Sequence, residues 1–89
     1  MKFEYDEKKS SANQLKHGIA FEQVKILWSV LAVEFEAKTV DEPRSMIIGK
    51  IDGKLYSCIF TIRGPAIRII SARRSRKSEE KIYYDYIKT

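Results

Sequence analysis

Three consecutive segments with β-strand composition, separated by tight-turn signals, constrain the fold of this chain more than any other feature. The segments span residues 45–51, 55–62 and 67–73. Asp52-Gly53 is a strong hairpin-turn dipeptide, and Arg63-Gly64-Pro65-Ala66 forms a second turn before the last segment. Connections this short join antiparallel neighbours. We therefore expect a β-meander in the second half of the chain.

Helical patterns precede and follow these strands. Asp6 is suited to cap a first helix over about residues 7–16, and Gly18 tolerates the left-handed conformation that ends helices. Apolar residues recur at helical spacing from Phe21, so a second helix is expected to start there. A final helix is expected from residue 75 or 78 to residue 87, because glutamates favour its N-terminus.

Two shorter strand signals complete the pattern, at residues 3–5 and residues 33–37. Together these elements predict an α+β fold, in which N-terminal helices and a C-terminal helix pack on an antiparallel β-meander sheet. A chain of 89 residues leaves room for one hydrophobic core, so residues 1–89 are expected to form a single domain. Cys58 is the only cysteine and cannot form an internal disulfide, so the core must stabilise the domain by itself.

Neither a membrane helix nor a signal peptide is expected. The longest apolar runs are far shorter than the roughly 20 residues that a membrane helix needs. Glu4 and Asp6 stand where a signal peptide would need its apolar segment. We therefore expect a cytoplasmic protein without a membrane partner.

The positive charge of the chain is concentrated in its last third. The net charge is +5, and residues 1–62 carry equal numbers of basic and acidic side chains. Residues 63–89 hold eight Lys and Arg against three Asp and Glu. A concentrated positive field attracts a polyanion such as nucleic acid, although a solvated basic helix would show the same composition.

Four arginines on the last hairpin are candidates for binding phosphate, because a guanidinium matches phosphate oxygens bidentately. Strand alternation predicts that Arg68 and Arg74 lie on one face and Arg73 on the other. A two-residue loop at Gly64-Pro65 would place Arg63 with Arg68 and Arg74, whereas a longer loop could place it with Arg73. Ion pairing explains any single arginine equally well. The glutamates considered as partners are Glu34, Glu36, Glu79 and Glu80.

His17 is the only histidine, and histidine is the side chain that can donate and accept a proton near neutral pH. Alternatively, His17 has only a structural role, because a histidine in the last turn of a helix interacts favourably with the helix dipole. Trp28 is expected in the core, whereas the C-terminal tyrosines could stack on bases. The chain has no metal-ligand spacing, so any catalysis is expected to need no metal or other cofactor.

Several segments, taken in order, resemble the BrnT toxin family. They are Phe3-Glu4-Tyr5-Asp6, Lys9, Asn13, Lys16-His17-Gly18-Ile19, Phe21-Glu22, Ile48-Gly49, Phe60-Thr61-Ile62-Arg63-Gly64 and Ile67-Arg68-Ile69-Ile70-Ser71-Ala72-Arg73-Arg74. The last segment combined with the Lys-His-Gly run is the most specific part. Tyr5 replaces the tryptophan that is usual in the family, and Ala20 replaces a frequent small polar cap.

The resemblance implies a RelE-like fold and a bacterial type II toxin that acts as a metal-independent endoribonuclease and inhibits translation. It also implies a BrnA-like antitoxin with a ribbon-helix-helix domain. The antitoxin would neutralise the toxin in a hetero-oligomer, and the toxin would contact operator DNA only indirectly through it.

Roles in such a ribonuclease can be assigned residue by residue. Arg63 and Arg73 are expected to stabilise the charge that develops on the phosphate, with Arg68 and Arg74 as alternatives. His17 is the leading candidate for proton transfer, with Tyr83 or Lys9 in reserve. The residues expected to bind RNA are Lys9, Lys16, Arg68, Ser71, Arg74 and Lys77.

Two other classes of function fit the same charge pattern. One is a non-catalytic nucleic-acid-binding module that regulates transcription or translation. The other is a protein-interaction module whose basic surface receives an acidic segment of a partner.

Overall fold

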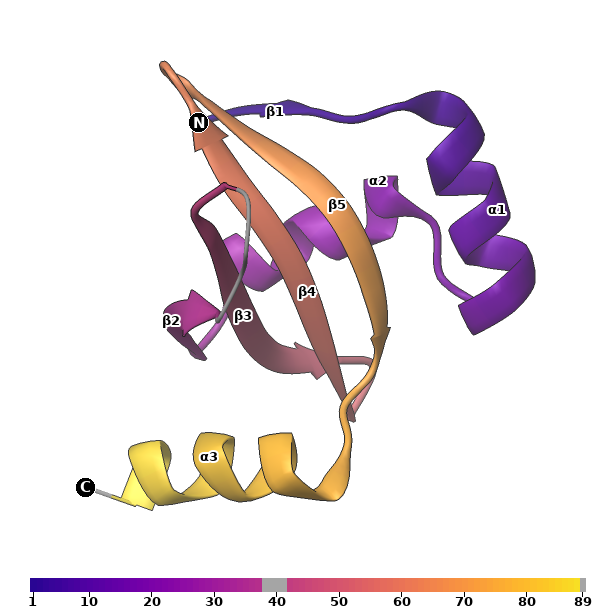
Figure 1. Ribbon diagram of the computed structural model, residues 1–89. Coiled ribbons are helices and arrows are strands. Elements are labelled where there is room, and N and C mark those ends of the chain that lie inside the picture. Colours follow the sequence, from indigo (N-terminus) through magenta and orange to yellow (C-terminus); the bar gives the residue numbers. More distant parts are fainter. Residues whose placement is uncertain (38–41, 89) are drawn as a thin grey trace.

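A five-stranded sheet with the order β1-β5-β4-β3-β2 organises the chain (Figure 1). The computed structural model describes residues 1–37 and 42–88. The elements are β1 (Lys2–Glu4), α1 (Glu7–His17), α2 (Phe21–Val24), the 3-10 helix η1 (Lys25–Trp28), β2 (Ala32–Ala37), β3 (Arg44–Ile51), β4 (Lys54–Arg63), β5 (Ala66–Arg74) and α3 (Lys77–Lys88). Every helix in the described part of the chain is too short or too polar to cross a membrane.

The expected antiparallel meander is confirmed for four strands, β2 to β5. Arg63 pairs with Ala66, so Gly64-Pro65 is the two-residue loop. The expectation of a wholly antiparallel sheet is wrong at one edge, because β1 pairs in parallel with β5, with Phe3 opposite Ile67. Parallel neighbours need a long connection, which the whole chain between β1 and β5 supplies. The fold is therefore α+β with a mixed sheet.

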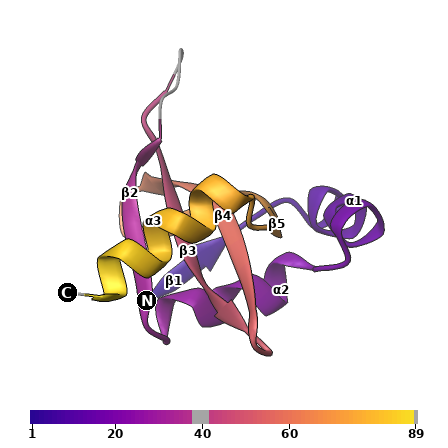
Figure 2. The ribbon, with the colours of Figure 1, turned by 90° about the horizontal axis from the view of Figure 1, so that it is seen from below.

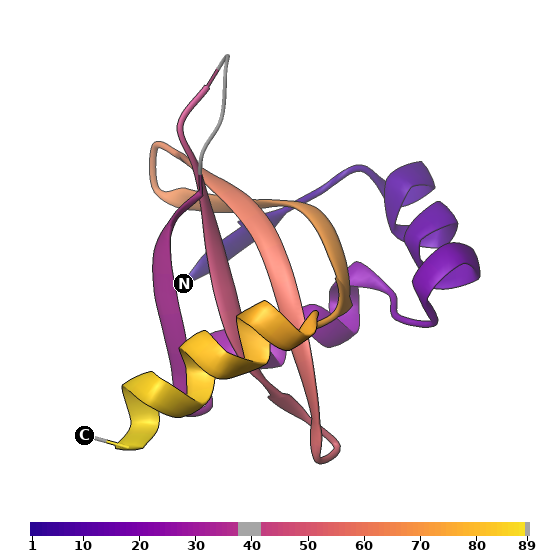
Figure 3. The same ribbon diagram turned by 60° about the horizontal axis from the view of Figure 1, so that its bottom comes forward.

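The sheet has a helix layer on each face (Figures 2 and 3). On one face, α2 and η1 cover a core centred on Phe21, Leu27 and Phe60, each at most 1% exposed. On the other face, Tyr83 of α3 packs against Val33, Ile48 and Leu55. Figure 3 shows α3 crossing in front of β2, β3 and β4, with α1 beyond β5. On the face of the sheet that α3 covers, the area over β5 is therefore left for side chains other than those of α3.

The structure defines the bounds of the second and the final helix. The second helix starts at Phe21 as predicted, but it changes to 3-10 geometry at Lys25 and ends at Trp28. Gly49 of β3 explains the close packing here, because a Cβ atom on it would lie 3.0 Å from Leu27 Cδ2. The final helix starts at Lys77, between the two expected positions.

Helix α1 is attached to the edge of β5 by polar contacts. Its buried residues are Ser10 and Asn13, whereas Leu15 is 91% exposed. Asn13 Nδ2 donates to the carbonyl oxygens of Ala72 and Ile19, both at 2.9 Å, and Asn13 Oδ1 accepts from Ala72 N at 3.2 Å. β1 covers the edge of β5 as far as Arg68, and the Asn13 amide takes the place of a neighbouring strand further along. These three bonds position α1 beside β5.

Helix α1 has an N-cap of its own and also supplies a cap to α2. Asp6 accepts hydrogen bonds from Lys8 N and Lys9 N, which confirms it as the N-cap of α1. Ala20 is the N-cap of α2 and has no side-chain oxygen for this purpose. Ser10 Oγ of α1 accepts from Phe21 N at 2.9 Å instead. A side chain distant in sequence thus replaces the missing cap, and α1 and α2 become one unit.

Helix α3 is anchored by an ion pair between Arg73, which is partly exposed, and the buried Glu79. Arg73 Nη1 and Nη2 donate to Glu79 Oε1 and Oε2, each at 2.8 Å. Ser57 Oγ and Arg76 N also donate to Glu79 Oε1, both at 2.9 Å. The Arg73 contact holds the pKa of Glu79 down, from its ordinary value of 4.5 to about 2, against the opposing effect of burial. A buried carboxylate with this many donors strongly favours the charged form.

We expect Asn13→Asp to destabilise the protein by about 3 kcal/mol at neutral pH, because a carboxylate cannot donate to the two carbonyl oxygens. The folded state raises the pKa of such a buried Asp, so the deficit should shrink as the pH falls and the carboxyl is protonated. Urea unfolding at pH 7 and pH 4 measures both effects. Gln14→Glu, on the exposed side of α1, is the matched control and should change stability little. A loss of stability equal to that of the control would show that Asn13 does not hold α1.

We expect Glu79→Gln to cost about 3 kcal/mol at pH 7, the free-energy equivalent of the pKa difference between 4.5 and 2. Because the pKa of Glu79 is lowered in the folded protein, its carboxylate stabilises the fold at pH values above the ordinary pKa of 4.5. This contribution disappears as the pH falls from 4.5 towards 2. Chemical unfolding of both proteins across this range should therefore show the difference narrowing with acidification. Glu80→Gln is the control at the neighbouring position. A difference that stays constant with pH would contradict the role of the ion pair.

Candidate functional site

A β-bulge in β5 decides which arginines share a face of the sheet. Ile59 and Phe60 of β4 lie opposite Ser71 and Ile69 of β5, which leaves Ile70 as an extra residue. An extra residue interrupts the alternation of side chains between the two faces. Residues of β5 before and after Ile70 therefore do not follow one alternating pattern.

The bulge places Arg63, Arg68 and Arg73 on one face. Arg68 lies opposite Thr61 and Arg73 opposite Ser57, and these two β4 residues are on the same face as Arg63. Arg74 lies on the other face, with its guanidinium 5.7 Å from the centre of the Tyr56 ring. The prediction that Arg68 shares a face with Arg74 is therefore wrong. It assumed an unbroken strand, and Ile70 shifts the pattern by one residue.

Arg63 and Arg68 share a loose ionic partner. Their Nη1 atoms lie 3.8 and 3.7 Å from Oε1 of Glu4. A charge-assisted hydrogen bond is about 2.7–2.9 Å long, so neither contact is tight. The side chains of Arg63 and Arg68 are 60% and 30% exposed. Both guanidiniums are therefore available to a stronger anionic ligand.

Arg73 is held differently. Its two terminal nitrogens bind Glu79, and Nη1 also donates to the carbonyl oxygen of Arg74 at 3.3 Å. Of the four glutamates considered as partners, Glu79 is the one that pairs with a candidate arginine in the described structure. Sequence reasoning did not consider Glu4, because only the parallel pairing of β1 with β5 brings it to Arg68.

A pocket of about 260 Å³ lies between α1 and the bulge of β5. It brings together four of the predicted site residues, His17, Lys9, Lys16 and Ser71, with Ala12, Asn13 and Ile70 completing the lining. The lysines lie on the same side of α1 as Asn13, which faces β5. Ser71 lies opposite Ile59, on the face of the sheet that carries Arg63 and Arg68. We call this face the arginine face, and the pocket adjoins it. Basic groups and a histidine thus meet at one edge of the sheet.

The remaining predicted residues lie elsewhere. Tyr83 is 4% exposed in the core beneath α3, and this burial argues against direct contact with RNA. Lys77 is exposed at the start of α3. Arg74 is on the α2 face. Tyr83, Lys77 and Arg74 therefore do not line the pocket that contains His17.

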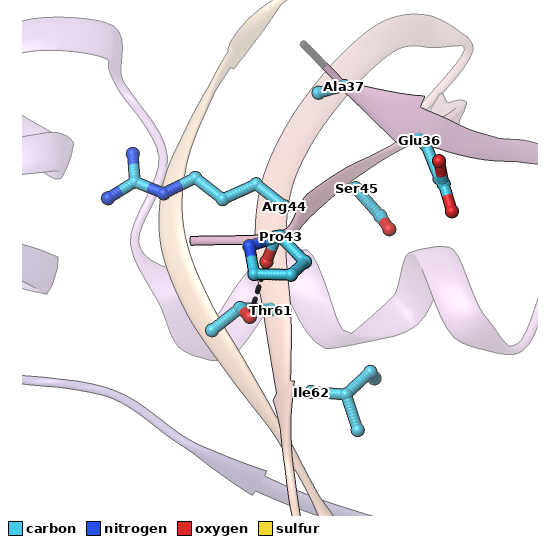
Figure 4. Close-up of a pocket in the computed structure, with 7 residues that line it drawn as sticks. All are labelled: Glu36, Ala37, Pro43, Arg44, Ser45, Thr61 and Ile62. Carbon is cyan, nitrogen blue, oxygen red and sulfur yellow. Dashed lines mark hydrogen bonds between the residues drawn. The ribbon is translucent and has the colours of Figure 1, made fainter. Parts of the chain in front are cut away.

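A second pocket lies where β2 and β4 end and β3 begins, lined by Glu36, Ala37, Pro43, Arg44, Ser45, Thr61 and Ile62 (Figure 4). It holds none of the predicted site residues. Thr61 Oγ1 donates to the Pro43 carbonyl oxygen at 2.8 Å, and the Arg44 side chain extends away from this contact. Arg44 alternates with Met46 and Ile48 on β3, so it shares the face of Arg63 and Arg68. Sequence reasoning did not single out Arg44, which stands outside the basic last third and pairs with Glu42 at 3.4 Å.

In residues 1–37 and 42–88, no three His, Cys, Asp or Glu side chains are grouped closely enough to hold a metal ion.

Comparison with protein families identifies the family to which the chain belongs. Residues 5–79 match the model of a family described as the ribonuclease toxin BrnT of type II toxin-antitoxin systems. Among curated proteins, no sequence matches the chain. The family match includes α1, the bulge of β5 and the Arg73–Glu79 ion pair. The chain therefore belongs to the BrnT family of type II toxin-antitoxin ribonuclease toxins.

Proposed function

We propose that this protein is a metal-independent endoribonuclease that inhibits translation by cleaving RNA. The observation that carries the proposal is the pocket with His17 and two lysines, which adjoins the face of Arg63 and Arg68. Membership of a ribonuclease toxin family supports the reaction class. Residues 1–89 act as a single RelE-like toxin domain in the cytoplasm under this proposal.

The proposed reaction is an attack of the RNA 2′-hydroxyl on the adjacent phosphorus. The O2′–P bond forms, the P–O5′ bond breaks, and the products carry a 2′,3′-cyclic phosphate and a 5′-hydroxyl. His17 removes the proton from O2′ and returns one to O5′. Arg63 and Arg68 stabilise the negative charge of the pentacovalent intermediate. No step of this sequence requires a metal ion.

The other residues have supporting roles in the proposal. Lys9 and Lys16 bind the RNA backbone, and Ser71 orients a phosphate between the pocket and the arginine face. Arg73 positions α3 and the end of β5 through Glu79 and does not contact the reacting phosphate. Arg74, Lys77 and Tyr83 are not assigned to that phosphate either, because they lie on other surfaces or in the core.

The partner is expected to be a BrnA-like ribbon-helix-helix antitoxin. Type II toxins are neutralised by a protein, and the exposed arginine face is a suitable surface for that protein to cover. In the resulting hetero-oligomer, the antitoxin would contact operator DNA and the toxin would do so only through it.

We expect Arg63→Ala and Arg68→Ala each to lower the rate of RNA cleavage by about 10²- to 10³-fold, the usual cost of removing one group that stabilises a developing charge. Growth arrest on expression should be relieved in parallel. Arg76→Ala removes the same charge from an exposed site beyond the end of β5 and is the matched control. Full activity in both test variants would contradict the assignment of these arginines.

We expect His17→Gln to lower kcat by about 10²- to 10⁴-fold while RNA binding is retained, because proton transfer is lost and the basic surface is not. Cleavage and binding are measured on the same short RNA. Gln14→Ala, on the exposed side of α1, controls for changes in the helix. If His17→Gln cleaves as fast as the unmodified protein, the proposal that His17 transfers the proton is wrong.

A further inference from the structure

Glu4 is a carboxylate in the middle of a surface that would otherwise be basic. It lies on β1 directly opposite Arg68 of β5, and one of its oxygens, Oε1, is shared by Arg68 and Arg63. The side chain of Glu4 is 38% exposed. Glu4 also precedes residues 5–79, the part of the chain that the family match covers. The carboxylate thus occupies the place between two guanidiniums where an anionic ligand would bind.

The ion pairs of Glu79 and Glu4 with arginines of this face differ in strength. Glu79 receives both terminal nitrogens of Arg73 at 2.8 Å and is itself 8% exposed. Glu4 receives one nitrogen from each of its arginines at 3.7 and 3.8 Å, in contact with solvent. Exposed pairs of this length are weak and are screened by salt. The Glu79 pair therefore persists, whereas the Glu4 pairs can be exchanged for a better ligand.

The fold does not depend on the Glu4 pairs. β1 is held by its ladder to β5 and by Phe3, whose ring packs edge-on against Trp28 with 5.2 Å between centroids. Tyr5, two residues after Phe3, packs edge-on against Phe21 and donates to Glu22 Oε2 at 2.9 Å. Glu4 lies between these two anchors on the opposite face of the strand. A neutral residue at this position should leave β1 in place.

We propose that Glu4 occupies the position of an RNA phosphate between Arg63 and Arg68, and that RNA binds by displacing it. This inference rests on the proposed function, because it takes the two arginines as phosphate ligands. A phosphate offers several oxygens and accepts a bidentate contact from each guanidinium, which a single carboxylate oxygen does not. In the free protein, Glu4 keeps the two guanidiniums converged and weakens their attraction for small anions. Glu4 is therefore a positioning residue that sets affinity and favours ligands with a phosphate backbone.

The test measures binding without cleavage. A fluorescent 2′-O-methyl RNA oligonucleotide of about twelve nucleotides lacks the attacking hydroxyl and remains intact under the proposed mechanism. Binding is measured at low and at moderate salt for the unmodified protein, Glu4→Gln and Glu34→Gln. Glu34 is exposed on β2, at the opposite edge of the sheet, so its variant has the same change in net charge. Glu4→Thr, with a strand-forming side chain, is a second neutral variant in case glutamine disturbs β1.

We expect Glu4→Gln and Glu4→Thr to bind about three- to tenfold more tightly than the unmodified protein at low salt, the effect of removing weak exposed pairs. The gain should shrink as salt is added, and Glu34→Gln should change affinity less than twofold. For cleavable RNA, KM should fall while kcat changes little. Equal gains in all three variants would overturn the inference, because they would reflect net charge alone.

Two further outcomes would also overturn it. Unchanged or weaker binding by both Glu4 variants would show that the carboxylate does not compete with phosphate. A large loss of kcat with unchanged binding would show that Glu4 acts in proton transfer. Absence of RNA binding by the unmodified protein would contradict the proposed function itself, and that result is distinguishable from failure of the Glu4 inference alone.

Discussion

The side-chain amide of Asn13 is the contact on which the arrangement of the candidate site depends. It accepts from the N–H and donates to the C=O of Ala72, and so it replaces a neighbouring strand where β1 ends. The bond to the carbonyl oxygen of Ile19 fixes the chain just after α1. This attachment sets α1 beside the bulge of β5, and it thereby brings His17 and the lysines of α1 to Ser71. A helix with a polar buried side, which looks poorly suited to a core, is in this way tied to a sheet edge.

The geometry of the ion pairs separates arginines that support the structure from arginines available to a ligand. Arg73 is bound by a buried carboxylate at hydrogen-bond distance, which joins β5 to α3. Arg63 and Arg68 meet Glu4 at longer distances on an exposed face. A phosphate would have to break the partly buried Arg73–Glu79 pair to use Arg73 fully, and breaking this pair costs more than exchanging an exposed one. Burial and distance, more than residue type, therefore decide which guanidiniums we assign to RNA.

Local signals in the sequence predicted the local structure well. The cap at Asp6, the helix end at Gly18 and the turn at Asp52-Gly53, where both residues have positive φ, follow from the chemistry of single residues. The bulge at Ile70, the parallel pairing of β1 and the cap that Ser10 provides to Phe21 arise from contacts between distant segments. These distant contacts determine the face of Arg68 and its pairing with Glu4. The residue types of the candidate site could therefore be predicted from the sequence, whereas their grouping required the fold.

We propose that the surface formed by the α1 pocket and the arginine face cleaves RNA by attack of the 2′-hydroxyl without a metal ion. The most direct measurement is incubation of the purified protein with a defined RNA in excess EDTA, followed by mass spectrometry of the fragment ends. We expect fragments with a 2′,3′-cyclic phosphate and a 5′-hydroxyl, and no cleavage of the same sequence with 2′-O-methyl groups. RNA that remains intact while bound, or fragments with 5′-phosphate ends, would contradict it.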